Sequence, residues 1–122
     1  PEMKAPRSCF WALCAVLSMS TAYAGDVRYL HEGMKASVAR KLILKNQWVP
    51  NLSQVSRESP MWGQQAQLFQ RGYTEVDRCA VDRSVCILKY RKKQACLEVE
   101  IEGEKASQMR VIGWSHDCQP DR

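Results

Sequence analysis

The chain has 122 residues, of which 18 are lysine or arginine and 13 are aspartate or glutamate, so its formal net charge is +5. This length is enough for one domain with a modest hydrophobic core. The basic residues are interspersed with acidic ones and accompany no nucleic-acid-binding motif, which argues against a nucleic-acid-binding protein.

Residues 1–24 have the layout of a secretory signal peptide. Lys4 and Arg7 form a short basic region, an apolar run follows over residues 9–19, and Ala22-Tyr23-Ala24 supplies a small-x-small cleavage signal. The run is too short to cross a membrane, which takes about 20 apolar residues. We therefore expect cleavage after residue 24, export to the periplasm or the extracellular space, and no stable membrane insertion of the mature chain. We read the two residues before Met3 as an addition upstream of the natural start.

The mature domain is predicted to be residues 25–122. Removing the signal peptide takes away two basic residues and one acidic residue, which leaves 98 residues with 16 basic and 12 acidic side chains and a net charge of +4. Four cysteines remain, and an even count in a small exported domain indicates two disulfides. No Cys-x-x-Cys pair occurs, so we expect neither a zinc site nor a cofactor.

The first helix is predicted over residues 32–46. Its apolar residues recur three and four positions apart, as on one face of an amphipathic helix: Met34, Val38, Ala39, Leu42 and Ile43. Its basic residues are expected to form a solvent-exposed outer face: Lys35, Arg40, Lys41 and Lys45. The helix should end before Pro50, because proline disfavours helical geometry in the residue before it.

A second helix is predicted over residues 60–71. Ser59 is a typical N-cap, and Pro60 suits the first helical position. Gly63 weakens the helix by about 1 kcal/mol relative to alanine. Gly72 is placed to end the helix and to lead into the first strand at Tyr73.

Four short runs rich in β-branched and aromatic residues follow, over residues 73–79, 84–90, 95–102 and 108–115. The third alternates apolar residues with glutamates, which is the pattern of a strand with one buried and one solvated face: Leu97, Val99 and Ile101 against Glu98, Glu100 and Glu102. The sequence therefore predicts an α+β domain in which two N-terminal helices pack on one face of a four-stranded antiparallel meander.

Strand register predicts the disulfide pairing. A hairpin that turns around residues 81–84 places Cys79 opposite Cys86, at a separation that a disulfide bridges. In the last hairpin Cys96 lies opposite residue 113, so the chain must curl back for Cys118 to reach it. A Cys79–Cys96 bridge would need adjacent strands, but the second strand lies between them in a meander. We therefore predict Cys79–Cys86 and Cys96–Cys118.

A motif in the middle of the chain resembles one found in small exported bacterial proteins of uncharacterised function. It consists of Trp48-x-Pro50, then Leu68-Phe69-x-x-Gly72-Tyr73-Thr74-Glu75-Val76-x-x-Cys79, then Cys86. The helix-helix-strand order is also similar to one repeat of the β-lactamase-inhibitor-protein type. This resemblance implies the architecture of an exported binding or inhibitor module, although a fold alone does not determine function.

Few residues suggest catalysis. His116 stands beside Asp117, but neighbouring residues at a strand end point in different directions, so we expect no general-base pair and no enzyme. The acidic row of Glu98, Glu100, Glu102 and Glu104 could hold calcium or a cationic partner. We expect instead a solvated face balanced by basic residues on the neighbouring strands.

Tryptophan and tyrosine dominate the binding energy of protein interfaces. The candidate binding surface therefore consists of aromatic residues: Trp48, Trp62, Tyr90 and Trp114. The sequence favours a disulfide-stapled module that binds a protein partner, as an inhibitor of, or immunity factor against, an exported enzyme. The alternatives are a structural accessory protein of the cell envelope and, less favoured, a small secreted enzyme that uses His116.

Overall fold

A computed structural model describes residues 26–52 and 63–119 of the chain. The predicted signal peptide, its cleavage site, the Ser59-Pro60 helix start and Trp62 lie outside these ranges. The described elements, in chain order, are α2 (Ala36–Lys45), β1 (Val49–Pro50), α4 (Gly63–Gln70), β2 (Val76–Cys79), β3 (Val85–Lys92), β4 (Ala95–Glu102), the short 3-10 helix η1 (Ala106–Gln108) and β5 (Arg110–Ser115).

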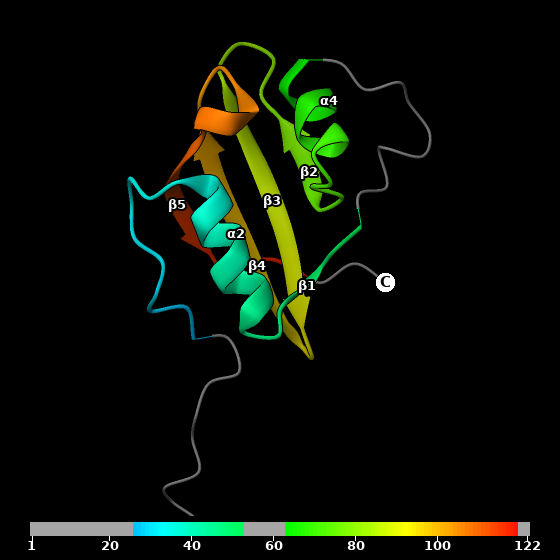
Figure 1. The fold of residues 1–122 in the computed structure, drawn as a ribbon. Coiled ribbons are helices and arrows are strands. Elements are labelled where there is room, and N and C mark those ends of the chain that lie inside the picture. Colours follow the sequence, from blue (N-terminus) through cyan, green and yellow to red (C-terminus); the bar gives the residue numbers. More distant parts are fainter. Residues whose placement is uncertain (1–25, 53–62, 120–122) are drawn as a thin grey trace, which may run out of the picture.

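The α+β class, the two helices and the antiparallel sheet are confirmed (Figure 1). Two details of the prediction are wrong. In the part of the chain that the structure describes, the sheet has five strands rather than four, and the helices are not a contiguous N-terminal pair, because β1 lies between them. The sheet also departs from a plain meander: its order is β1-β3-β4-β5, and β2 pairs with β3 as well.

The extra strand β1 occupies the edge of β3 next to β2. Val49 pairs with Arg91 and Pro50 with Tyr90, whereas β2 begins its pairing with β3 at Leu88. Two short strands thus lie end to end along one long strand. The proline reads as a helix breaker in the sequence, and it is tolerated here because an edge strand has one side that needs no N–H donor.

The lead segment, defined here as residues 26–35, explains why α2 begins four residues later than predicted. Gly33 N–H donates to the Val111 carbonyl (2.8 Å), and Val111 N–H donates to the Met34 carbonyl (2.9 Å). The backbone of residues 33–35 is therefore satisfied by β5 rather than by a first helical turn.

The buried face of α2 is rotated by comparison with the predicted stripe. Ala39 and Ile43 are buried as expected, but Ala36 joins them and Val38 is 44% exposed. Leu42 packs against the edge of the core. This rotation has a consequence for the polar side of the helix, because it turns Arg40 toward the sheet.

The alternating strand behaves as predicted. The apolar residues of β4 are buried beneath the helices together with their partners on β3: Leu97, Val99 and Ile101 against Tyr90, Leu88 and Cys86. On the other face Glu98 lies opposite Lys89, and Glu102 lies opposite Arg110. Basic residues on the neighbouring strands therefore lie opposite two of the three glutamates, as predicted. The face is only partly solvated, because Glu98 and Glu100 are half-buried and Lys89 is buried.

Both predicted disulfides are present. Cys79 and Cys86 are directly opposite across β2 and β3, with a Cα–Cα distance of 4.0 Å. Cys96 at the start of β4 is bonded to Cys118, which follows β5, with a Cα–Cα distance of 5.6 Å. The second bridge brings residues 116–118 back along the end of the sheet.

Candidate functional site

The structure does not assemble the four predicted aromatic residues into one surface. Trp48 is 2% exposed and Tyr90 is fully buried, so both belong to the core. Trp114 at the end of β5 is 37% exposed. Trp62 lies outside the described residues. Of the predicted surface, Trp114 is therefore the residue that the structure places within reach of a partner.

His116 is held against the core instead of forming a pair with Asp117. Its ring stacks on Trp48, with centroids 6.0 Å apart and an angle of 26° between the planes. Its Nδ1 donates to the Cys96 carbonyl (3.1 Å). The backbone N–H of Asp117 donates to Ser115 Oγ (2.9 Å). This arrangement positions His116 by contacts other than a carboxylate, which does not match an oriented general base.

An open groove of about 960 Å³ lies at the end of the sheet near the β3–β4 turn, and we call it the terminal groove. Its lining residues are Asp26, Val27, Arg28 and Leu30 of the lead segment, Lys92, Lys93, Gln94, Ala95 and Cys96 around the β3–β4 turn, and Trp114, His116 and Cys118 near the end of the chain. Three separate stretches of sequence thus meet at one place, and the Cys96–Cys118 disulfide ties two of them together.

The terminal groove combines an apolar wall with a basic rim. Val27 and Leu30 are part of the hydrophobic core and also face the groove. Three cationic side chains and one carboxylate line it: Arg28, Lys92, Lys93 and Asp26. The carboxylate is paired within the rim, because Asp26 Oδ2 lies 3.0 Å from Arg28 Nε. The rim therefore keeps a net positive charge.

The rim lysines are presented by the tight β3–β4 turn. Lys93 has a positive φ of 55°, as turn residues that reverse a chain often do. Lys92 Nζ donates to the Asn46 carbonyl (2.8 Å) and lies 6.0 Å from the centroid of the Trp48 ring. Lys92 is thus fixed in place, whereas the neighbouring Lys93 is exposed to solvent.

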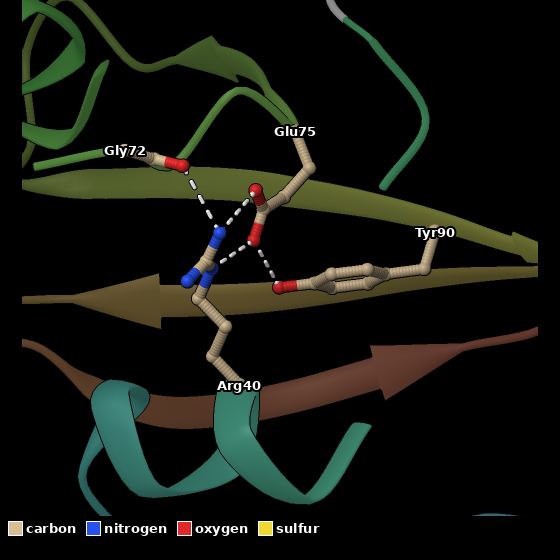
Figure 2. A network of polar contacts seen from close by, with 4 residues as sticks. All are labelled: Arg40, Gly72, Glu75 and Tyr90. Carbon is tan, nitrogen blue, oxygen red and sulfur yellow. Dashed lines mark hydrogen bonds and ion pairs between the residues drawn. The ribbon is translucent and has the colours of Figure 1, made fainter. Parts of the chain in front are cut away.

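A second polar cluster lies inside the molecule, between α2 and the sheet (Figure 2). Glu75, just before β2, has a fully buried side chain, and its Oε2 accepts hydrogen bonds from Arg40 Nε (2.6 Å) and from the Tyr90 hydroxyl (2.6 Å). Arg40 Nη2 donates to the Gly72 carbonyl (3.0 Å), and its guanidinium lies 4.5 Å from the centroid of the Tyr73 ring.

The pKa values within this cluster follow from burial and from the buried carboxylate. Burial raises the pKa of Tyr90 well above its usual value, and the charge and hydrogen bond of Glu75 raise it further. Burial acts to lower the pKa of Arg40, but the hydrogen bond and the charge of Glu75 outweigh it and raise the pKa. Both groups therefore keep their protons throughout the physiological range. Because the Glu75 side chain is inaccessible, we interpret the cluster as a structural ion pair between α2 and the sheet.

Neither the helical periodicity nor the spacing of charged residues predicts this cluster. The periodicity of the first helix predicts that Arg40 lies on the solvent-exposed basic face, and this prediction is wrong. Glu75 occurs in the sequence analysis only as a residue of the motif at residues 72–79, with no predicted contact.

Among the described residues, no three His, Cys, Asp or Glu side chains are grouped as metal ligands would be. No helix within residues 26–52 and 63–119 combines the length and apolar character needed to cross a membrane.

Comparison of the chain with protein families, with curated proteins and with solved structures finds no match. The resemblance to small exported bacterial proteins and to the β-lactamase-inhibitor-protein type therefore stays a prediction.

Proposed function

We propose that this protein is a small exported binding module that holds a protein partner at the terminal groove. The observation that carries the proposal is the placement of the exposed Trp114 beside an apolar wall and a basic rim. Exposed tryptophan at the edge of an apolar depression is typical of a binding hot spot. The two disulfides and the predicted signal peptide support action outside the cytoplasm.

The size and construction of the groove favour the binding of a protein partner over catalysis. Its volume lies in the range of ligand sites, about 300–1,000 Å³, but it is open to solvent rather than enclosed, as a surface that receives a polypeptide segment would be. The Cys96–Cys118 bridge fixes one wall before binding. A preformed wall lowers the entropy lost on association.

Site-specific cross-linking tests the proposal. A benzophenone amino acid replaces Gln94, which lines the groove, and the protein is expressed and irradiated in its native cells. The matched control carries the same group at Val81, an 87% exposed residue in the β2–β3 turn. We expect a discrete cross-linked partner from position 94 alone, and its loss when Trp114→Ala is added. The same pattern from both positions, or a yield that Trp114→Ala leaves unchanged, would show that the groove is not the binding site.

The identity of the captured partner separates the forms of the proposal. An exported enzyme whose activity falls on adding the purified protein supports an inhibitor or immunity factor. A partner that builds the cell envelope, with no activity to inhibit, supports a structural accessory protein instead.

A further inference from the structure

The free edge of the sheet lies beside the terminal groove. β5 is the last strand in the order β1-β3-β4-β5, so among residues 26–52 and 63–119 no strand pairs with one of its sides. The lead segment covers part of that side, where Gly33 and Met34 bond to Val111. In the described ranges no backbone hydrogen bond joins the lead segment to β5 beyond Val111 toward its C-terminal end. Figure 1 shows the lead segment continuing past this point as an irregular chain.

The backbone pairing fixes which way Trp114 presents its polar groups. Lys89 N–H donates to the Glu75 carbonyl, so the backbone groups of Lys89 face away from β4. Because these directions alternate along an antiparallel strand, Leu88 bonds to its partner Val99 on β4. The backbone N–H and C=O of Val99 therefore point toward β3. On its other side, Val99 and its partner Trp114 form a pair without hydrogen bonds. The N–H and C=O of Trp114 thus point to the free edge.

The same residue joins this edge to the groove. The Trp114 side chain lies on the same sheet face as its partner Val99, and Trp114 is also one of the residues that line the groove. An extended segment that bonds to the Trp114 backbone would run along β5, and its alternate side chains would face the apolar wall formed by Val27 and Leu30. Main-chain bonds at an edge with side-chain pockets beside it are the features of recognition by strand addition.

We infer that the partner contributes an extended, acidic segment, which adds to the sheet as a strand beside β5 at Trp114. This inference rests on the proposed function and specifies the part of the partner that is bound. Charge selects the segment: Lys92, Lys93 and Arg28 outnumber the one carboxylate of the rim, so acidic side chains are favoured there. A second copy of this chain would bring the same positive rim against the first, and like charges oppose that pairing.

Peptide probes test the inference directly. The probe is a fluorescein-labelled peptide of eight residues, with alternating Val and Thr in its middle four positions to pair with β5 and two Glu at each end to reach the basic rim, and its control replaces each Glu by Lys. Fluorescence anisotropy should show binding of the Glu peptide that weakens with salt, and at least about tenfold weaker binding of the Lys peptide. Equal binding of both peptides, or no binding of the Glu peptide, would overturn the inference.

N-methylation distinguishes strand pairing from other modes of binding. One version of the Glu peptide carries N-methyl groups on the Val amides, and another carries them on the Thr amides. Each removes the donors from one edge of an extended peptide. We expect one version to lose affinity by about tenfold and the other to retain it. Equal losses in both versions, or no loss in either, would contradict pairing along β5.

Two substitutions of the same residue provide the matched test on the protein. Trp114→Val and Trp114→Pro both remove the indole, but only the proline also removes the outward N–H. That N–H makes no bond to β4, so the sheet itself should tolerate the proline. We expect Trp114→Pro to bind the Glu peptide more weakly than Trp114→Val. Amide exchange at residue 114 in the wild type should also slow by about tenfold in the complex, a result that does not depend on the folding of a variant.

The outcomes separate the two proposals. Cross-linking from position 94 without any edge effect would leave a binding module whose partner is not a strand. Sedimentation of the protein without peptide tests the remaining occupant: a dimer that Trp114→Pro abolishes would show that a second copy takes the edge, and would overturn the inference.

Discussion

Replacing Arg40 by methionine should destabilise the protein severely, because it leaves the Glu75 carboxylate buried without its charged partner. The Glu75 side chain is fully buried, and Arg40 provides two of its hydrogen bonds, at 2.6 and 3.3 Å. Removing one member of a buried ion pair costs about 3–5 kcal/mol, since the remaining charge is desolvated without compensation. Domains of this size have a total stability of about 5–15 kcal/mol.

The double variant Arg40→Met with Glu75→Met identifies the cause. It also removes the unpaired buried charge of Glu75. Replacing both members of a buried ion pair by apolar residues often changes stability little. We therefore expect the double variant to be more stable than Arg40→Met alone. The matched control is Lys41→Met, an exposed basic residue on the same helix, which should change stability by less than about 0.5 kcal/mol.

The assay is equilibrium unfolding in urea with both disulfides intact, followed by far-ultraviolet circular dichroism. The free energies of unfolding of the single and double variants give the coupling between the two residues. If Arg40→Met costs no more than Lys41→Met, or if the double variant is less stable than either single one, then the cluster does not tie α2 to the sheet as described.

Four further outcomes are expected. Stability should fall as the pH rises above about 10, by up to about 1.4 kcal/mol per unit, because buried Tyr90 keeps its proton where the unfolded phenol loses it; Tyr90→Phe should reduce that slope. Val99→Asp should unfold the domain by burying an unpaired charge, whereas Glu100→Lys should be mild in the same urea titration. Gly103→Ala should lower the melting temperature, because a Cβ there would lie 2.9 Å from the Met109 Cα. Intact-mass analysis of exported protein should give a chain that begins at Gly25; a mass that retains residues 3–24 would contradict this.

The features that sequence predicted well depend on local pattern. The alternation in β4 assigned each residue to a face, because side chains on a strand repeat every two residues. The hairpin register placed Cys79 opposite Cys86, because a short turn leaves few choices. These relations involve neighbours in the chain, so their geometry is contained in the spacing of the residues.

The features that sequence missed depend on contacts between distant segments. The two-residue strand β1 is too short to give a pattern, and it forms because β3 offers an open edge at Tyr90 and Arg91. Val38 belongs to the apolar stripe in the sequence but is exposed, since the rotation of α2 is determined by what faces it. One such facing residue is Glu75, which is 35 positions from Arg40.

The candidate site was predicted only in part for the same reason. Trp114 was identified as an aromatic residue of a binding surface, but Trp48 and Tyr90 could not be separated from it by composition alone. Both are buried by residues that are distant in the sequence: Trp48 packs in the core and stacks on His116, and Tyr90 lies on the core face of β3 opposite Leu97. The basic rim joins the lead segment to the β3–β4 turn, which lies more than 60 residues further along the chain.

The two disulfides are placed to do different things. Cys79–Cys86 joins paired residues seven positions apart, so it reinforces a contact that the β2–β3 ladder already makes. Cys96–Cys118 spans 22 positions and joins the start of β4 to residues beyond the last strand. A bridge that closes a longer loop restricts the unfolded chain more. It also holds Cys118 and the neighbouring His116 at the terminal groove, where the chain has left the sheet and has no ladder to position it. The shape of the proposed binding site therefore depends on the Cys96–Cys118 bridge. The Cys79–Cys86 bridge contributes instead to the stability of the β2–β3 hairpin.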